Sequence, residues 1–188
     1  MSHNSNIPPF SLGETYKGTD NGSLINSDLL GQEFEFPVET LVNGVATRTN
    51  GRVVKVRIVR NESGGALTGG VIVATAPTAG IAGTTKITGA ATAAKQRNVY
   101  IADPDLPSAG VADDDLFYVI IEGPSNVRVP AAGVAITAGQ WCHTTDAGRA
   151  TPTTTAADAA YIMGTFLATQ ADTNDGGLCP IDVKLAWA

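Results

Sequence analysis

A cysteine beside a histidine is the residue pair in this chain best suited to nucleophilic catalysis. Cys142 and His143 are adjacent, and a thiolate next to an imidazole is a usual activated nucleophile. The surrounding residues have the character of a strand, however, and neighbours in a strand point to opposite faces. The two groups therefore cannot meet unless a bulge intervenes. The other histidine is His3, so we expect no catalytic site and predict that His143 is an exposed or hydrogen-bonded strand residue.

Clustered carboxylates are the next candidate functional groups, because they can form a cation-binding site. Residues 172–177 begin like a calcium loop, but the fifth position is Gly176 and the twelfth is Val183, where a bidentate carboxylate is required. A tight polar turn accounts for the stretch. The aspartates at 113–115 would bind a cation if an oligomer axis gathered several copies. We favour a solvated loop before a strand.

Signatures of cofactor, metal and sugar sites are weak. A phosphate-binding loop would need a glycine-rich turn followed by Lys-Ser/Thr and the start of a helix. The glycine pairs 64–65 and 69–70 are followed by neither, so we predict no such loop. Cys142 and Cys179 lack the paired spacing of a zinc site and form either one bridge or, as we favour, two buried thiols. Trp141 and Trp187 are too few for a sugar-stacking platform and are assigned to the core. We expect no enzyme activity, no cofactor and no metal.

Composition and charge narrow the class of protein. The chain has 188 residues, 43% of them hydrophobic, with 21 glycines and a formal net charge of −6. An acidic chain would need strongly clustered basic residues to lie against phosphates, so direct nucleic-acid binding is not expected. No apolar run approaches the roughly 20 residues of a membrane span, and Met1 is not followed by a secretory signal. We expect no membrane association and synthesis in a cytoplasm.

The elements that must position these residues are predicted to be strands. Val54, Val56 and Ile58 alternate with Lys55 and Arg57, which predicts a strand with one apolar and one basic face. Residues 116–121 form an apolar run that we expect to be the central strand, ending at a Gly-Pro pair. Many short strands with glycine-rich turns favour an all-β fold, a small β-barrel or sandwich of short antiparallel strands. Further strands are expected at 33–36, 71–74, 98–101, 126–129, 134–137, 141–145, 161–169 and 181–187.

Residues 1–30 differ from the body at 31–188. They are rich in Ser, Asn, Gly and Thr, and their few apolar residues show no sustained period. Such a segment buries too little surface to order by itself. We interpret it as an extended arm that is either disordered or ordered by laying apolar residues on a neighbouring subunit. The residues that would make this contact are Ile7, Pro8, Pro9, Phe10 and Leu12.

A cluster of basic residues offers a second possible interface. Five of the twelve Lys and Arg residues fall within 48–60, and such a stripe would dock on an acidic partner surface. The alternative, which we favour, is that these residues pair across strands with Glu33, Glu35 and Glu39 or face water. The stripe consists of Arg48, Arg52, Lys55, Arg57 and Arg60.

Several strand-and-turn segments resemble capsid decoration, or cement, proteins of tailed bacteriophages. The main one is residues 110–124, with the sequence GVADDDLFYVIIEGP, preceded by VRIVRNESGGAL at 56–67. VAITAGQ at 134–140 and the GRAT turn at 148–151 add to the resemblance, which covers most of residues 52–188. These are structural patterns of moderate specificity, and the family has no catalytic residues to transfer.

The resemblance implies a small β-barrel on the outside of an icosahedral head. Such proteins clamp neighbouring major capsid protein subunits, usually as homo-oligomers; we favour a trimer, with a dimer as the alternative. The chain would then be made in the bacterial host cytoplasm and reside on the outer capsid surface. Two other hypotheses remain: a virion-surface or cell-surface domain that recognises a receptor or glycan, and a β-fold hydrolase that depends on Cys142 or His143.

Overall fold

A computed structural model describes residues 7–42, 45–75, 85–92, 99–130, 134–154, 162–170 and 177–185, with no side chains described over 39–51 or at 146. The chain is all-β, as predicted. Two 3-10 helices, η1 (Ser27–Leu29) and η2 (Asp146–Gly148), are the helical elements of these residues. The strands are β1 (Thr19–Asp20), β2 (Ser23–Leu24), β3 (Glu33–Val42), β4 (Val45–Asn61), β5 (Ile72–Thr75), β6 (Lys86–Ala90), β7 (Val99–Ala102), β8 (Leu116–Arg128), β9 (Trp141–Thr144), β10 (Ala150–Thr153), β11 (Gly164–Phe166) and β12 (Leu178–Lys184).

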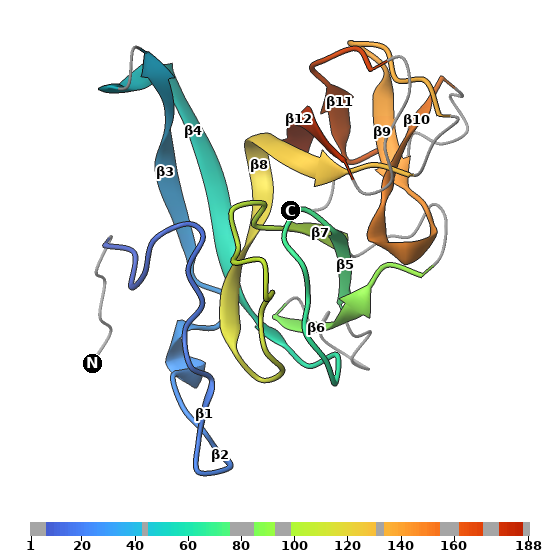
Figure 1. Ribbon diagram of the computed structural model, residues 1–188. Helices are drawn as coiled ribbons and strands as arrows, with labels where there is room; N and C mark the ends of the chain where they lie inside the picture. The colour runs from blue at the N-terminus through green and yellow to red at the C-terminus, as the bar shows by residue number, and fades with distance from the viewer. Residues whose placement is uncertain are drawn as a thin grey trace.

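Five strands close into a small barrel at the centre of the molecule (Figure 1). Ten strands form one sheet in the order β10-β9-β11-β12-β8-β7-β5-β6-β4-β3, and an additional pairing joins β8 to β4. That pairing closes the ring β4-β8-β7-β5-β6. Only the β4–β6 contact in this ring is parallel. Among the described residues no helix is long and apolar enough to span a membrane.

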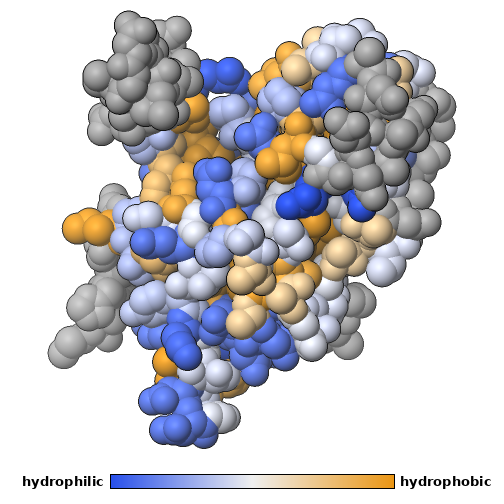
Figure 2. Space-filling view, in the orientation of Figure 1, coloured by the Kyte–Doolittle hydropathy of each residue, from blue (hydrophilic) through white to orange (hydrophobic). Residues whose placement is uncertain are grey.

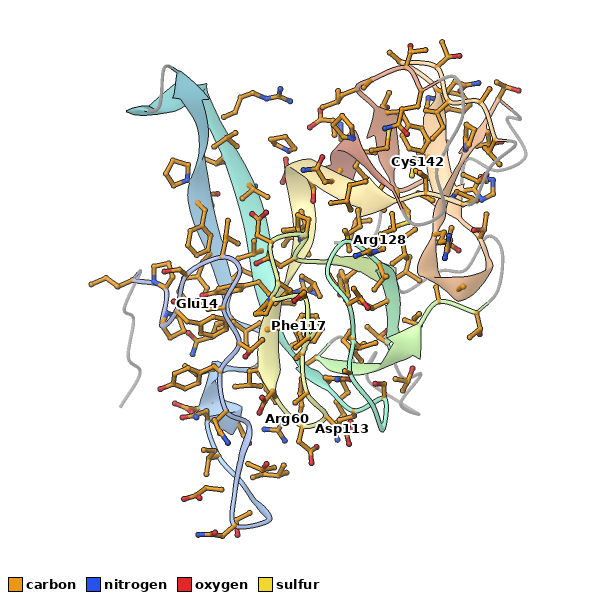
Figure 3. The ribbon with its side chains drawn as sticks, in the orientation of Figure 1. Glu14, Arg60, Asp113, Phe117, Arg128 and Cys142 are labelled. Carbon is orange, nitrogen blue, oxygen red and sulfur yellow. The ribbon has the colours of Figure 1, made fainter. Side chains whose placement is uncertain are left out.

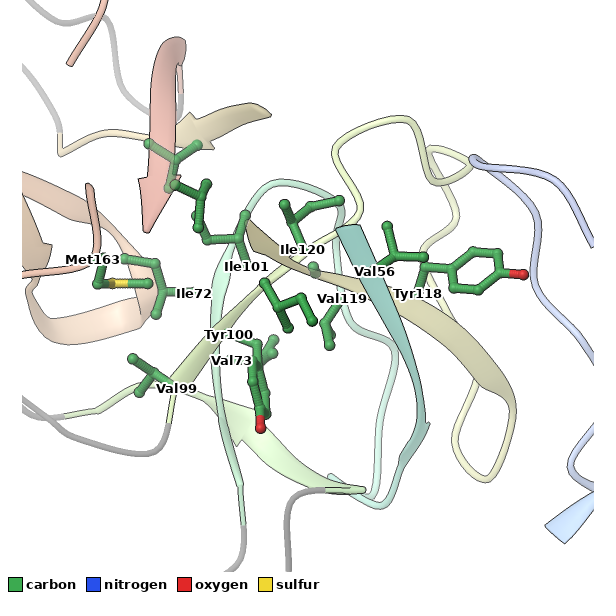
Figure 4. Close-up of a cluster of buried hydrophobic side chains, with 14 of the residues drawn as sticks. Val56, Ile72, Val73, Val99, Tyr100, Ile101, Tyr118, Val119, Ile120 and Met163 are labelled. Atoms are coloured by element: carbon green, nitrogen blue, oxygen red, sulfur yellow. The ribbon is translucent and has the colours of Figure 1, made fainter. Parts of the chain in front are cut away.

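Strand β8 is buried on both faces, which explains its unbroken apolar run. Val119 points into the ring toward Tyr100 and Val73, whereas Tyr118 points to the opposite side, toward the N-terminal segment (Figure 4). All residues from Leu116 to Ile121 are at most 4% exposed. Burial on both faces removes the need for polar alternation, so the prediction of a central strand here is confirmed.

The same strand is longer than the sequence predicted. Gly123 and Pro124 were expected to end it, but β8 continues to Arg128 and bends at Gly123, whose φ is 100°. The pairing with β4 also shifts by one residue between Lys55 and Val56, which marks a bulge. This bend carries β8 out of the barrel and into a second group of strands, where it pairs with β12. The expected separate strand at 126–129 is therefore part of β8.

The C-terminal strands form a lobe beside the barrel (Figure 1). β12 pairs with β8 and β11, and β11 pairs in turn with β9, which pairs with β10. These strands are short, as predicted, and their buried residues include Phe166, Ile181 and Val183. Met163 of this lobe lies near Ile72 of β5, which joins the lobe to the barrel (Figure 4).

Strands β3 and β4 form a long ribbon that projects from the barrel on the side facing the C-terminal lobe (Figure 1). They pair from Glu33 and Arg57 at the base to Val42 and Val45 near the tip. On its other edge β4 pairs with β8 only from Lys55 onward. The outer part of the ribbon therefore stands away from the rest of the sheet.

The N-terminal segment lies against the chain's own barrel. Tyr16 and Leu116 form a two-hydrogen-bond bridge, with N–O distances of 2.8 and 2.7 Å. The amide of Gly31 donates to the carbonyl of Ile58 at 2.9 Å. The hairpin β1–β2 turns at Asn21 and Gly22, both with positive φ, as an Asn-Gly turn requires. Contact of this segment with a neighbouring subunit stays a prediction.

Candidate functional site

The cysteine-histidine pair lies in the C-terminal lobe, on β9. The side chain of Cys142 is fully buried, and burial raises the pKa of its thiol. His143 is 7% exposed, and its Nδ1 lies 2.8 Å from the carbonyl oxygen of Thr144. Cys142 and Cys179 are both free and buried, as favoured from the sequence. A buried thiol with a raised pKa is a poor nucleophile.

Two of the aspartates before β8 accept hydrogen bonds from the backbone of other loops. Asp113 accepts a hydrogen bond from the amide of Gly64 at 2.8 Å, and Asp115 accepts one from the amide of Gly18 at 3.4 Å. In the part of the chain that the structure describes, no group of three His, Cys, Asp or Glu residues is placed to hold a metal ion. The calcium-like stretch at 172–176 lies outside the described residues.

The predicted basic stripe is largely paired within the chain, as the favoured alternative proposed. Lys55 lies 2.9 Å from Glu122 and 3.9 Å from Glu35, and its hydrogen bond to Glu122 raises the pKa of the amine. Arg57 pairs with Glu33 and also contacts the ring and hydroxyl of Tyr100.

Two other stripe residues have different surroundings. Arg60 is 1% exposed and donates to the carbonyl of Ile25 and the hydroxyl of Ser27, so its side chain is inside the protein. Arg52 lies on the surface, 3.3 Å from Asp182 of β12. The side chains of Arg48 and Glu39 lie outside the described residues. The stripe is thus not a continuous free basic surface over its described part.

The apolar residues of the N-terminal segment divide into buried and exposed ones. Phe10 is 8% exposed and stacks on Tyr118, so its side chain is used within the chain. Ile7 is 77% exposed. Pro9 is also exposed, whereas Pro8 and Leu12 are half-buried. Ile7 and Pro9 are thus the most exposed members of this set.

An apolar hollow between the projecting ribbon and the C-terminal lobe brings together segments that are far apart in the sequence. We call it the interlobe groove; its volume is about 340 Å³. Figure 2 shows hydrophobic surface on both sides of this hollow. Its lining residues are Leu12, Pro37, Val38, Val54, Asp103, Pro104, Asp105, Ile120, Pro124, Ser125, Asn126, Leu167 and Pro180.

The two walls of the groove diverge from the bend in β8. One wall is the ribbon, with Val54 facing the hollow, and the other includes Leu167, which is 44% exposed. The Arg52–Asp182 ion pair connects β4 of the ribbon to β12 of the lobe. Ser125 contributes a buried hydroxyl that has no hydrogen-bond partner among the described residues. The bend at Gly123 thus creates the space.

Carboxylates occupy one part of the groove lining. Asp103 is 1% exposed and accepts hydrogen bonds from the amides of Gly13 at 2.7 Å and Asp105 at 3.1 Å. Burial raises the pKa of this carboxyl, and these two hydrogen bonds oppose the shift. Asp105 is exposed. No described residue forms an ion pair with either carboxylate.

A second hollow, of about 390 Å³, lies over Glu33, Glu35 and Lys55. Its charged groups are already in ion pairs, Glu35 with Lys55 and Glu33 with Arg57, which leaves little for a partner to satisfy. The interlobe groove instead offers apolar surface and the exposed carboxylate of Asp105. Exposed apolar side chains gathered in a hollow are typical of surfaces that bind a protein segment.

The labelled side chains in Figure 3 show how scattered the predicted sites are: Cys142 lies in the C-terminal lobe, and Arg60 and Asp113 lie at the opposite end of the barrel. Of the predicted interface residues, Leu12 lines the interlobe groove and Arg52 joins its two sides. Leu167 and Asp105 were not identified from the sequence. Each is a single loop residue with no local pattern to mark it.

The chain has few detectable relatives. No protein-family model matches it, and no curated protein matches it in sequence. Among solved structures it is similar to the N base of head fiber gp8.5 in bacteriophage phi29, with 19% identity and a TM-score of 0.45. That match covers 69% of this chain and 92% of the other. A likeness at this level assigns no role to any residue.

Proposed function

We propose that the chain is a structural virion protein that binds the outer surface of a phage head and stabilises it by clamping neighbouring major capsid protein subunits. The observation that carries the proposal is the position of the two segments that resemble decoration proteins. Residues 56–67 and 110–124 contain the paired strands at the centre of the barrel, in register from Val56 and Ile120 to Arg60 and Leu116. The two segments that resemble decoration proteins therefore lie side by side in the barrel, on the paired strands β4 and β8.

Other properties support the same role. The net charge of −6 suits a surface away from packaged DNA. A projecting ribbon and an apolar groove offer surface for contacts that repeat at every copy around a shell. We also propose that the protein acts as a homo-oligomer, most simply a trimer, that it is made in the host cytoplasm, and that it has no catalytic activity.

Cosedimentation tests the proposal. Purified protein is mixed with expanded heads that lack it, and the heads are pelleted and then heated. We expect the protein to pellet with the heads and to raise the temperature at which they rupture. If it stays in the supernatant and the heads rupture at an unchanged temperature, the proposed role is wrong. Light scattering of the free protein gives the number of subunits.

Glycan recognition is a second candidate, favoured by the position of Trp141. This side chain was assigned to the core, yet it is 41% exposed. In the sheet, Trp141 of β9 lies opposite Thr153 of β10 on one side and opposite Thr165 of β11 on the other. Thr165 in turn lies opposite Asp182 of β12. An exposed indole with flanking hydroxyl and carboxylate groups can stack on a sugar ring and bind its hydroxyls. Binding to a saccharide panel that is lost on Trp141→Ala would support this candidate, and no binding would eliminate it.

A further inference from the structure

We propose that the interlobe groove receives an extended segment of the shell subunit, one with apolar side chains and a Lys or Arg that meets Asp105. This inference rests on the proposed function, because it names the surface through which the chain would attach. It also specifies the chemistry of the partner: a strand-like peptide with apolar residues and one cation. Three independent features of the groove lead to this occupant.

The first feature is unburied apolar surface. Leu167, which lines the groove, is 44% exposed. Water-exposed apolar residues gathered in a hollow mark sites where a partner is bound. The groove's volume of about 340 Å³ lies within the range of pockets that enclose ligands, about 300–1,000 Å³.

The second feature is an open backbone edge beside the groove, on β4, the strand that contributes the lining residue Val54. β4 pairs with β8 only from Lys55 onward, and the described part of the chain places no other strand on that edge from Val45 to Arg52. An unpaired strand edge favours addition of an extended segment, which completes the backbone hydrogen bonds. An extended peptide therefore fits better than a helix or a small molecule.

The third feature is charge. Two cations of β4, the strand that contributes Val54 to the groove, are already matched, since Arg52 pairs with Asp182 and Lys55 pairs with Glu122. Asp105 and the buried Asp103 have no such partner among the described residues. A basic residue on the occupant would complement them and would favour the ionised form of Asp103. An acidic segment would be repelled.

Matched substitutions test the inference. Leu167→Asp and Asp105→Lys change the groove at exposed positions. Leu24→Asp and Asp20→Lys make the same changes on the exposed β1–β2 hairpin, which lies at the end of the molecule away from the C-terminal lobe (Figure 1). The probe is the empty head of the phage that encodes the chain, purified without it and titrated with each variant in a cosedimentation assay. Circular dichroism confirms that each variant is folded.

We expect each groove variant to bind about tenfold or more weakly than the wild type, and the hairpin variants to bind within about twofold of it. Added salt should weaken wild-type binding more than that of Asp105→Lys. Equal binding by groove and hairpin variants would overturn the groove proposal alone. No binding by the wild type would overturn the proposed function with it. If the groove variants instead lose self-association, the occupant is a second copy and the shell-segment proposal is wrong.

Discussion

The hydroxyl of Tyr118 donates a hydrogen bond to the carbonyl oxygen of Phe10 at 3.0 Å, and the two rings stack with their centroids 4.3 Å apart. This contact joins the N-terminal segment to the central strand of the barrel across 108 positions of sequence. Phe34 and Phe36 pack edge-on against the same tyrosine ring. The segment and the barrel therefore share one core, and the stability of each depends on the other.

Replacing Tyr118 by Phe should lower the free energy of unfolding by about 1 kcal/mol, because it removes one buried hydrogen bond and keeps the ring contacts. Phe10→Ala should cost more, about 3 kcal/mol, since it removes a buried ring from the cluster. Urea denaturation measures both changes. If Phe10→Ala leaves stability unchanged, the segment is not part of the core.

Asp103 should make stability depend on pH. Burial raises its pKa in the folded chain above the ordinary value of 3.8, so the folded state holds this proton more tightly than the unfolded state. The free energy of unfolding should therefore fall as pH rises from that ordinary value through the raised folded pKa, and this contribution should then level off. Urea unfolding from about pH 3 to about pH 7 measures the slope. Asp103→Asn should remove this component; an identical slope in the variant would contradict the assignment.

Gly123 should not tolerate a side chain. Its φ is 100°, and an added Cβ would lie 2.4 Å from the carbonyl oxygen of Val53. We expect Gly123→Ala to cost about 3 kcal/mol or more, from backbone strain and the clash together. Gly64→Ala is the control, because Gly64 also has positive φ, 77°, but its Cβ would meet open space; it should cost about 1 kcal/mol. Thermal unfolding compares them, and equal losses would show that the bend at Gly123 is not tightly packed.

Arg57 should contribute more to the free energy of unfolding than Arg52, although both form ion pairs. The Arg57 side chain is 14% exposed and contacts both Glu33 and Tyr100, whereas that of Arg52 is 47% exposed and, among the described side chains, pairs with Asp182. Arg57→Ala should cost about 2 kcal/mol, and Arg52→Ala about 0.5 kcal/mol or less. Arg57→Lys should fall between the wild type and Arg57→Ala, because one ammonium group cannot reproduce the guanidinium contacts. A larger loss in the Arg52 variant would reverse this assignment.

Patterns that repeat along a strand were predictable from the sequence. Val54, Val56 and Ile58 are buried and Lys55 is not, as their alternation indicated. The apolar run at 116–121 is the central strand because both of its faces are covered. In each case the local pattern reflects contacts that repeat at every second residue or at every residue.

Features that depend on segments far apart in the sequence were not predictable. The end of the central strand was placed at Gly123, which in the protein bends the strand and leaves it paired to β12. Arg60 continues a basic pattern but is buried, because the N-terminal segment supplies the partners Ile25 and Ser27. The interlobe groove combines residues from Leu12 to Pro180. No window of sequence contains such a site.

A cryo-electron microscopy reconstruction of the phage head, compared with that of heads lacking this chain, tests the central claim most directly. The account predicts extra density on the outer surface that fits the barrel and lobe, bridges adjacent capsid subunits, and places an extended segment of a subunit between the ribbon and the C-terminal lobe. Identical maps, or density confined to the tail or to the inside of the head, would contradict it.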